Sequence, residues 1–265
     1  MKALELEMTL PIGFSSKGQE FREFELRPVK GRLRRDYLNL RKRSPARETF
    51  VALKHIVAKL GPLDIPSDAF LRKLTLPDVD YIFLLVSMHE SDNGNIAWKH
   101  VCDETLGGCG NESDLSVDPK EIDLIDGSPP IQFTDDGSPI QITEFQDPVL
   151  KTTAKIVFKV PTLDDQIRLF DKMSAGNQET FGNFIFHQMS NMMIDYNDMG
   201  RGLTVDELDD LPVKTVDALL EHNNSHQPTQ LDTEVVYACG KCGMEHTVQL
   251  PLDEWLAPFS QTTGA

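Results

Sequence analysis

The sequence lacks long apolar runs. Its 265 residues contain no stretch that approaches the roughly 18 consecutive apolar residues of a membrane span. The first ten residues alternate charged and apolar side chains, so they also lack the apolar centre of a secretory signal. Together these absences predict a soluble, intracellular protein with no membrane partner.

Motifs of common enzymes are also missing. The sequence has no glycine-rich phosphate loop, nucleophile elbow, kinase signature or HExxH zinc-protease motif. Its seven histidines form no recognisable catalytic triad with a serine or a cysteine. We therefore predict a protein that is not an enzyme and has no small-molecule substrate.

Positive charge is scarce. Lys and Arg number 26 against 42 Asp and Glu, which gives a formal net charge of −16. Because proteins bind nucleic acid by neutralising phosphates with clustered positive charge, this balance argues against a general nucleic-acid binder. The remaining composition, 40% apolar and 26% charged, is that of a globular chain.

The basic residues are unevenly distributed. Residues 22–47 contain ten Lys or Arg and three Asp or Glu, a net charge of +7, whereas residues 48–265 carry a net charge of −22. Such a segment either folds back on the acidic body, with long side chains covering apolar surface, or docks on an acidic partner. The predicted partner-binding residues are the following: Arg32, Arg34, Arg35, Arg41, Lys42 and Arg43, with Trp255 and Phe259 of the apolar C-terminal tail.

Four cysteines form two local pairs. Cys239 and Cys242 make a CxxCG knuckle, in which two thiolates on a tight glycine-containing turn can bind one metal ion from the same side. Cys102 and Cys109 have six intervening residues, so they form a looser knuckle. Strand-like sequence flanks both pairs, and in both the second cysteine is followed by Gly and, two residues later, by Glu.

Two such hairpins facing each other would make a zinc ribbon with four thiolate ligands and a structural zinc ion. The interval of 129 residues between Cys109 and Cys239 then implies a subdomain inserted between two half-sites. Three alternatives remain open: two disulfides, a redox pair, and a catalytic zinc with an open position near His100 or His246. In an intracellular setting, thiols stay reduced, which argues against the first.

The pattern of the remaining chain predicts an α+β fold. The sequence favours an N-terminal hairpin with its turn at residues 13–18, a basic helix over residues 31–42, and a helix with Phe50, Leu53, Val57 and Leu60 on one face. A deeply buried helix is predicted over residues 76–88.

The sequence between the cysteine pairs predicts a mixed α/β insert. Strands are expected at residues 131–133, 140–145 and 156–160, and helices at residues 181–196 and from Pro212. Thr162–Asp165 and Thr204–Glu207 predict capping boxes at helix starts. Met189, Met192 and Met193 are interpreted as core rather than as a docking surface.

Short motifs near both ends of the chain resemble one family. They are Leu10–Gly13, Arg22–Val29, the helix Leu76–Met88 before Cys102 and Cys109, the segment from Asp232 through the second knuckle, and the Trp255–Phe259 ending. Together they are similar to the T4-type baseplate hub assembly and tail assembly proteins of contractile-tailed bacteriophages. Residues 118–230 match no pattern of this family.

The resemblance implies a structural or assembly role in the tail baseplate, with other tail and baseplate proteins as partners. It places the chain in the virion tail, or in the host cytoplasm during assembly. The predicted parts are residues 1–117, an insert at 118–230, and residues 231–265. The alternative function is a zinc-ribbon adaptor that binds nucleic acid or a transcription partner through residues 30–47.

Overall fold

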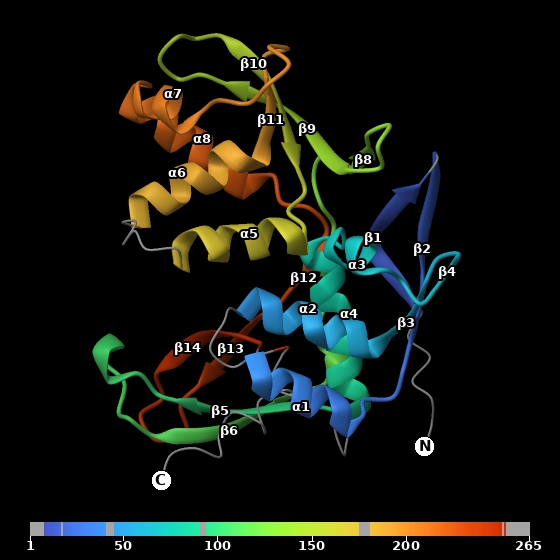
Figure 1. Ribbon diagram of the computed structural model, residues 1–265. Helices are drawn as coiled ribbons and strands as arrows, with labels where there is room; N and C mark the ends of the chain where they lie inside the picture. The colour runs from blue at the N-terminus through green and yellow to red at the C-terminus, as the bar shows by residue number, and fades with distance from the viewer. Residues whose placement is uncertain are drawn as a thin grey trace. The chain divides into compact units, whose positions relative to one another are not determined.

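A computed structural model describes residues 8–16, 18–40, 45–90, 94–174, 181–250 and 252. Over these residues the chain combines α-helices with several small antiparallel sheets (Figure 1). This confirms the predicted α+β class. None of the helices in these ranges is long and apolar enough to cross a bilayer.

The chain divides into two compact units, and each joins segments that are distant in sequence. The smaller one, which we call the cysteine unit, combines the described residues of Asp80–Ile125 with those from Leu231 to Leu252. The larger unit combines Glu7–Val79 with Asp126–Gln230. The predicted boundaries at residues 117/118 and 230/231 stay a prediction.

The larger unit begins with an antiparallel sheet of strand order β1-β2-β3-β4. Its elements, in chain order, are β1 (Thr9–Ser16), β2 (Gln19–Leu26), α1 (Gly31–Leu40), α2 (Pro45–Ile56), β3 (Val57–Leu60), β4 (Leu63–Asp64) and α3 (Asp68–Arg72). The predicted N-terminal hairpin is confirmed, and so is the basic helix over residues 31–40, whereas its predicted residues 41 and 42 lie outside the described residues. The predicted end of the second helix is wrong: Val57 and Leu60 belong to β3, whose backbone pairs with β2.

The predicted turn over residues 13–18 is also wrong, because β1 continues through Gly13 to Ser16. The β1–β2 register shifts between Thr9 and Phe14, and Gly13 adopts φ +76° within this bulge. A Cβ atom at Gly13 would lie 2.4 Å from the Phe21 carbonyl oxygen, so the position requires glycine.

A buried carboxylate accounts for the bulge. Asp78, near the start of α4 (Leu76–Glu90), is fully buried and accepts hydrogen bonds from the amides of Ile12, at 2.8 Å, and Gly13. It also accepts one from Thr75 Oγ1 at 2.7 Å. Burial raises the pKa of Asp78 to about 6 although these three donors oppose the rise. Asp78 thus attaches the first strand to the start of α4.

A second antiparallel sheet in the larger unit has strand order β11-β10-β9-β8. Its strands and the helices that follow are β8 (Gln132–Phe133), β9 (Pro139–Gln146), β10 (Thr153–Lys159), α5 (Leu163–Ser174), α6 (Phe181–Met192), β11 (Met193–Tyr196), α7 (Val205–Asp209) and α8 (Val213–Ser225). The helix predicted to run to residue 196 ends at Met192, because residues 193–196 pair with β10 instead.

The core of this part confirms the interpretation of its methionines. Met189 and Met193 are buried with Phe145, Ile156 and Phe158, and Met192 packs against the same cluster. Both capping boxes are present as predicted. Thr162 and Asp165 exchange hydrogen bonds at the start of α5, and Thr204 and Glu207 do so at the start of α7.

The cysteine unit contains most of α4, two hairpins that lie side by side in Figure 1, and two further strands of two residues each. Its elements after α4 are β5 (Ile96–Val101), β6 (Glu112–Val117), β7 (Leu124–Ile125), β12 (Gln230–Leu231), β13 (Glu234–Ala238) and β14 (Glu245–Gln249). Seven of the eight residues from Tyr81 to Met88 are buried apolar side chains, which confirms the deeply buried helix. The eighth, Ser87, donates a hydrogen bond to the Leu252 carbonyl at 2.9 Å.

Candidate metal centre

Each cysteine pair lies at the turn of an antiparallel hairpin. In the β5–β6 hairpin, the Cys102 amide donates to the Asn111 carbonyl at 2.9 Å and the Gly110 amide donates to the Cys102 carbonyl at 3.0 Å. In the β13–β14 hairpin, Cys239 and Met244 form the first of these bonds at 2.8 Å, and Gly243 and Cys239 form the second at 2.8 Å. The two knuckles therefore share one backbone frame.

Glycine allows the same backbone conformation at equivalent positions of the two knuckles. Gly110 and Gly243, each directly after the second cysteine of its pair, adopt φ +69° and +73°. The six residues inside the first pair are accommodated by a 3-10 turn, Glu104–Leu106, which Asp103 caps by accepting the Thr105 amide hydrogen bond at 2.7 Å. The parallel between the two knuckles that the sequence predicts is confirmed in the backbone.

All four sulfurs converge. The Sγ atoms of Cys102, Cys109, Cys239 and Cys242 lie within 4.8 Å of one another. The Cys102–Cys242 and Cys109–Cys239 separations, which join one hairpin to the other, are both 3.7 Å. A disulfide bond needs about 2.05 Å, so the four residues are free cysteines.

The spacing fits a tetrahedral ion. Sulfur atoms at about 2.3 Å from a tetrahedral zinc ion are about 3.8 Å apart, close to the two measured 3.7 Å separations. Cys102 and Cys239 are buried, whereas Cys109 is half-buried and Cys242 exposed. One side of the cluster therefore faces the protein and the other faces solvent.

The two buried thiols differ in pKa. Amides of Cys242 and Lys241 donate to the Cys239 sulfur and lower the pKa of Cys239 to about 6. The Cys109 amide, at 3.2 Å, lowers the pKa of Cys102, but burial and the three neighbouring thiols outweigh it and raise that pKa to about 12. Four thiolates this close need a cation to compensate their charge.

Three aromatic rings lie beside the cluster. His100 of β5 packs edge-on against Tyr237 of β13, with ring centroids 5.0 Å apart, and Tyr237 stacks on His246 of β14 at 5.3 Å. His246 Nε2 lies 3.1 Å from Cys102 Sγ. His100 Nε2 and the Tyr237 hydroxyl are buried and have no hydrogen-bond partner in the described part of the chain.

The predicted partner-binding residues are only partly described. Arg32 and Arg35 lie on α1 with 73% and 68% of their side chains exposed, and both approach Asp36. The Arg34 side chain, Arg41, Lys42, Arg43, Trp255 and Phe259 are outside the described residues. The partner-binding role of the whole set stays a prediction.

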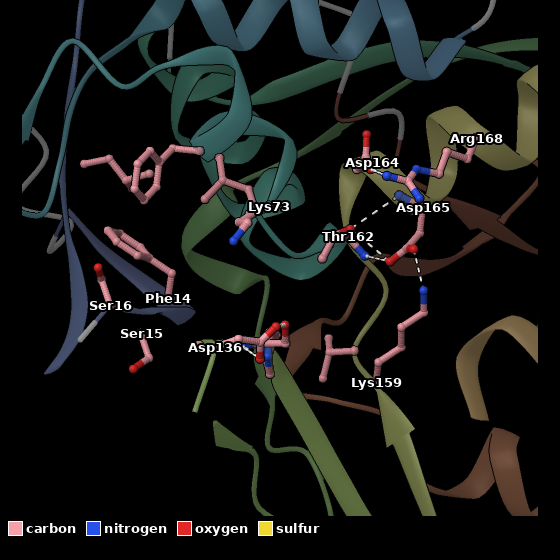
Figure 2. Close-up of a pocket in the computed structure, with 17 residues that line it drawn as sticks. Phe14, Ser15, Ser16, Lys73, Asp136, Lys159, Thr162, Asp164, Asp165 and Arg168 are labelled. Atoms are coloured by element: carbon pink, nitrogen blue, oxygen red, sulfur yellow. Dashed lines mark hydrogen bonds and ion pairs between the residues drawn. The ribbon is translucent and has the colours of Figure 1, made fainter. Parts of the chain in front are cut away.

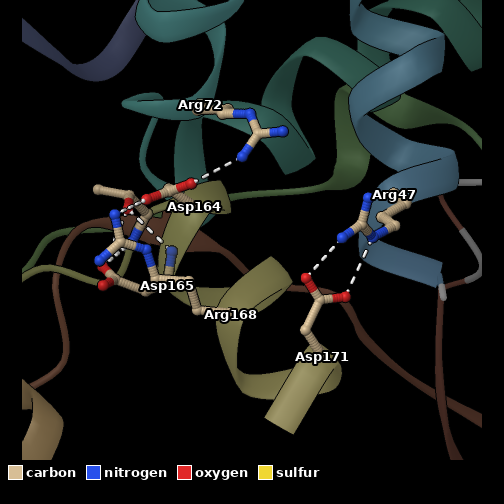
Figure 3. A network of polar contacts seen from close by, with 7 residues as sticks. Arg47, Arg72, Asp164, Asp165, Arg168 and Asp171 are labelled. Carbon is tan, nitrogen blue, oxygen red and sulfur yellow. Dashed lines mark hydrogen bonds and ion pairs between the residues drawn. The ribbon is translucent and has the colours of Figure 1, made fainter. Parts of the chain in front are cut away.

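Part of the basic segment does fold back within the larger unit. Arg47 of α2 makes a two-pronged ion pair with Asp171 of α5, at 3.0 and 2.6 Å (Figure 3). Arg72 of α3 and Arg168 bind Asp164 at 3.1 and 2.8 Å. Arg47 also holds the pKa of Asp171 below its usual value. Neither sequence pattern nor charge counting assigns these partners.

The larger unit also has a cavity of about 350 Å³ between β1, β9 and the start of α5 (Figure 2). Its carboxylates are already bonded within the chain: Asp164 to Arg168, Asp165 to Lys159 and Thr162, and Asp136 to Thr134 and Ser138. In the described residues, the group suited to hold a metal ion is the four-cysteine cluster and not this cavity.

Comparison with known proteins gives one match. The family model for T4 bacteriophage base plate protein matches residues 3–253, nearly the whole chain. No curated protein sequence and no solved structure is significantly similar to the chain.

Proposed function

Because the chain belongs to the T4 bacteriophage base plate protein family, we propose that it is a non-enzymatic structural or assembly component of a phage tail baseplate, stabilised by one structural zinc ion. The family match across residues 3–253 is the observation that supports the baseplate role. The convergence of four thiols from two distant hairpins supports the zinc ion.

The donor set favours zinc in a structural role. Four cysteine sulfurs in a tetrahedral arrangement are the usual ligands of structural zinc sites, and such a shell leaves no open position for a substrate or an activated water. The ion would hold Cys102 and Cys109 to Cys239 and Cys242 across 129 intervening residues. Its binding free energy would thereby become part of the folding free energy.

Other tail and baseplate proteins are the partners that family membership implies, with the virion tail as location. For the chain's own contribution, we propose the basic segment as a cationic docking surface for an acidic protein, with the exposed Arg32 and Arg35 of α1 and, from the sequence, Arg34, Arg41, Lys42 and Arg43. Trp255 and Phe259 would supply apolar anchors at a second surface.

Metal analysis tests the site. The purified chain should contain one zinc ion, and both C102S/C109S and C239S/C242S should lose it completely, because each pair supplies half of one shell. The control K241S alters an exposed side chain within the second knuckle and should keep the ion. Two ions per chain, or full zinc content in either double variant, would contradict a shared site.

Particle composition tests the role. Tails and tail-assembly intermediates purified from the encoding phage should contain the chain, and phage carrying C239S/C242S should yield fewer complete baseplates than phage carrying K241S. Mass spectrometry of the gradient-purified fractions measures both. If every tail fraction and every intermediate lacks the wild-type chain, the baseplate role is wrong.

A further inference from the structure

His246 contacts the metal centre from the opposite hairpin. It lies on β14, is only 8% exposed, and places Nε2 3.1 Å from the sulfur of Cys102, which follows β5. The contact therefore crosses between two hairpins that are remote in sequence. It also concerns the sulfur of a fully buried cysteine, so water cannot replace the imidazole there without rearrangement.

The direction of this hydrogen bond follows from the state of the sulfur. A metal-bound Cys102 is a thiolate and has no hydrogen to donate, so the hydrogen of the contact must be on His246 Nε2. Resting on the zinc site proposed above, we propose that His246 is the hydrogen-bond donor that stabilises the Cys102 thiolate in the zinc-bound centre. It is a positioning residue and not a ligand.

The donors around the Cys102 sulfur support this role. In the longer first knuckle, the Cys109 amide is the backbone donor to Cys102. The imidazole of His246 gives Cys102 a second donor.

The two hairpins differ at the position of this donor. Four residues after the second cysteine of each pair, the first hairpin has Ser113 and the second has His246. Both residues lie opposite an aromatic ring on the neighbouring strand, Ser113 opposite His100 and His246 opposite Tyr237. The donor is therefore specific to one half of an otherwise shared frame.

A ligand role for His246 does not fit the geometry. The metal-ligating atoms that lie within 4.8 Å of one another in the described residues are the four sulfurs, and no imidazole nitrogen joins them. Four thiolates already complete a tetrahedral shell. A separation of 3.1 Å from one sulfur is a hydrogen-bond distance, and neighbouring donors of this type tune metal affinity from outside the shell.

Two matched variants distinguish the effect of the N–H donor from that of the aromatic ring. H246F keeps an aromatic ring on Tyr237 and removes the N–H group. H100F makes the same change in the same ring cluster, at a nitrogen without a partner in the described chain. Competition with a chromophoric chelator should show zinc affinity about 10–100-fold weaker in H246F and unchanged in H100F.

Cobalt substitution and nitrogen NMR complete the test. Cobalt-loaded H246F should retain a four-thiolate absorption spectrum. In the zinc-loaded wild-type protein, ¹⁵N NMR should show the hydrogen on His246 Nε2, a measurement that needs no variant to fold.

Three results would overturn the donor role: wild-type affinity in H246F, equal weakening in H246F and H100F, or an Nε2 atom without hydrogen in the wild type. Loss of the four-thiolate spectrum in H246F would instead identify a ligand and would also overturn it. A wild-type chain that binds no zinc would contradict the zinc site itself, which is a different failure.

Discussion

His222 is one side chain that makes the stability of the larger unit depend on pH. Its Nε2 lies 2.9 Å from Thr143 Oγ1, and its ring packs against Phe145 and, at 4.0 Å between centroids, against His226. Burial lowers the pKa of His222 to about 4, and the nearby His226 adds to this effect. The folded chain therefore holds this imidazole neutral at pH values where an unfolded chain would protonate it.

This shift predicts acid sensitivity. The ordinary pKa of histidine is 6.5, so as the pH falls the unfolded chain takes up the proton before the folded chain does. The contribution of His222 to the unfolding free energy should therefore decrease between pH 6.5 and about pH 4. Denaturant unfolding at a series of pH values should show a smaller loss over this window in H222Q than in the wild type.

The comparison must be made between variants, because Asp78 titrates in the same range. Its raised pKa, about 6, means that the folded chain takes up that proton first, so its contribution rises as the pH falls. Asp78 contributes equally to the unfolding free energy of the wild type and of H222Q, so its contribution cancels in the difference between their pH profiles. The exposed His89, changed to Gln, is the control, and a wild-type pH profile in H222Q would contradict the assignment.

At the scale of elements, α4 and α5 begin next to each other within the larger unit. Thr75 and Thr162 form an isolated antiparallel bridge directly before α4 and α5. Each threonine is followed three residues later by an aspartate, Asp78 or Asp165, that bonds to it. A local pattern predicts each cap, whereas the bridge depends on where the chain returns after more than eighty residues.

The acidic start of α5 has two physical causes. Asp164 and Asp165 lie in its first turn, where the helix dipole favours negative charge. The structure adds cations from other elements, Arg72 of α3 to Asp164 and Lys159 of β10 to Asp165. Because these side chains are partly exposed, the pairs contribute more to specifying the position of α5 than to overall stability.

At the scale of the whole molecule, the chain returns to each unit after a long excursion. The cysteine unit is completed only when the chain re-enters at Leu231, after 105 residues of the larger unit. Closing such a loop costs conformational entropy, and a metal ion held by both ends offsets that cost. Zinc should therefore matter most for the elements that carry the four cysteines.

Hydrogen exchange after zinc removal tests this expectation. A strong chelator should accelerate amide exchange in β5, β6, β13 and β14 and leave β9 and β10 of the larger unit protected. The C239S/C242S chain, which should lack the ion, should show no further change with chelator. Equal loss of protection in both sets of strands would contradict a metal effect confined to the cysteine unit.

The sequence by itself determined the local features of this protein. Glycines after Cys109 and Cys242, Thr-x-x-Asp or Thr-x-x-Glu caps, and the apolar stretch of α4 each depend on residues a few positions apart. The α+β class and both cysteine hairpins follow from such patterns, and so does the family resemblance. Charge counting likewise separated a basic segment from an acidic body.

Only the tertiary structure decided which distant groups meet. Residues 57–60 and 193–196 continue helical patterns, yet they became strands because the edges of β2 and β10 offered backbone partners. Gly13 became a bulge because Asp78, 65 residues away, accepts its amide hydrogen bond. The sequence places His246 close to the second cysteine pair, but it lies beside Cys102 of the first pair because the two hairpins pack together. Such contacts depend on the balance of packing and desolvation over the whole chain, which no local pattern records.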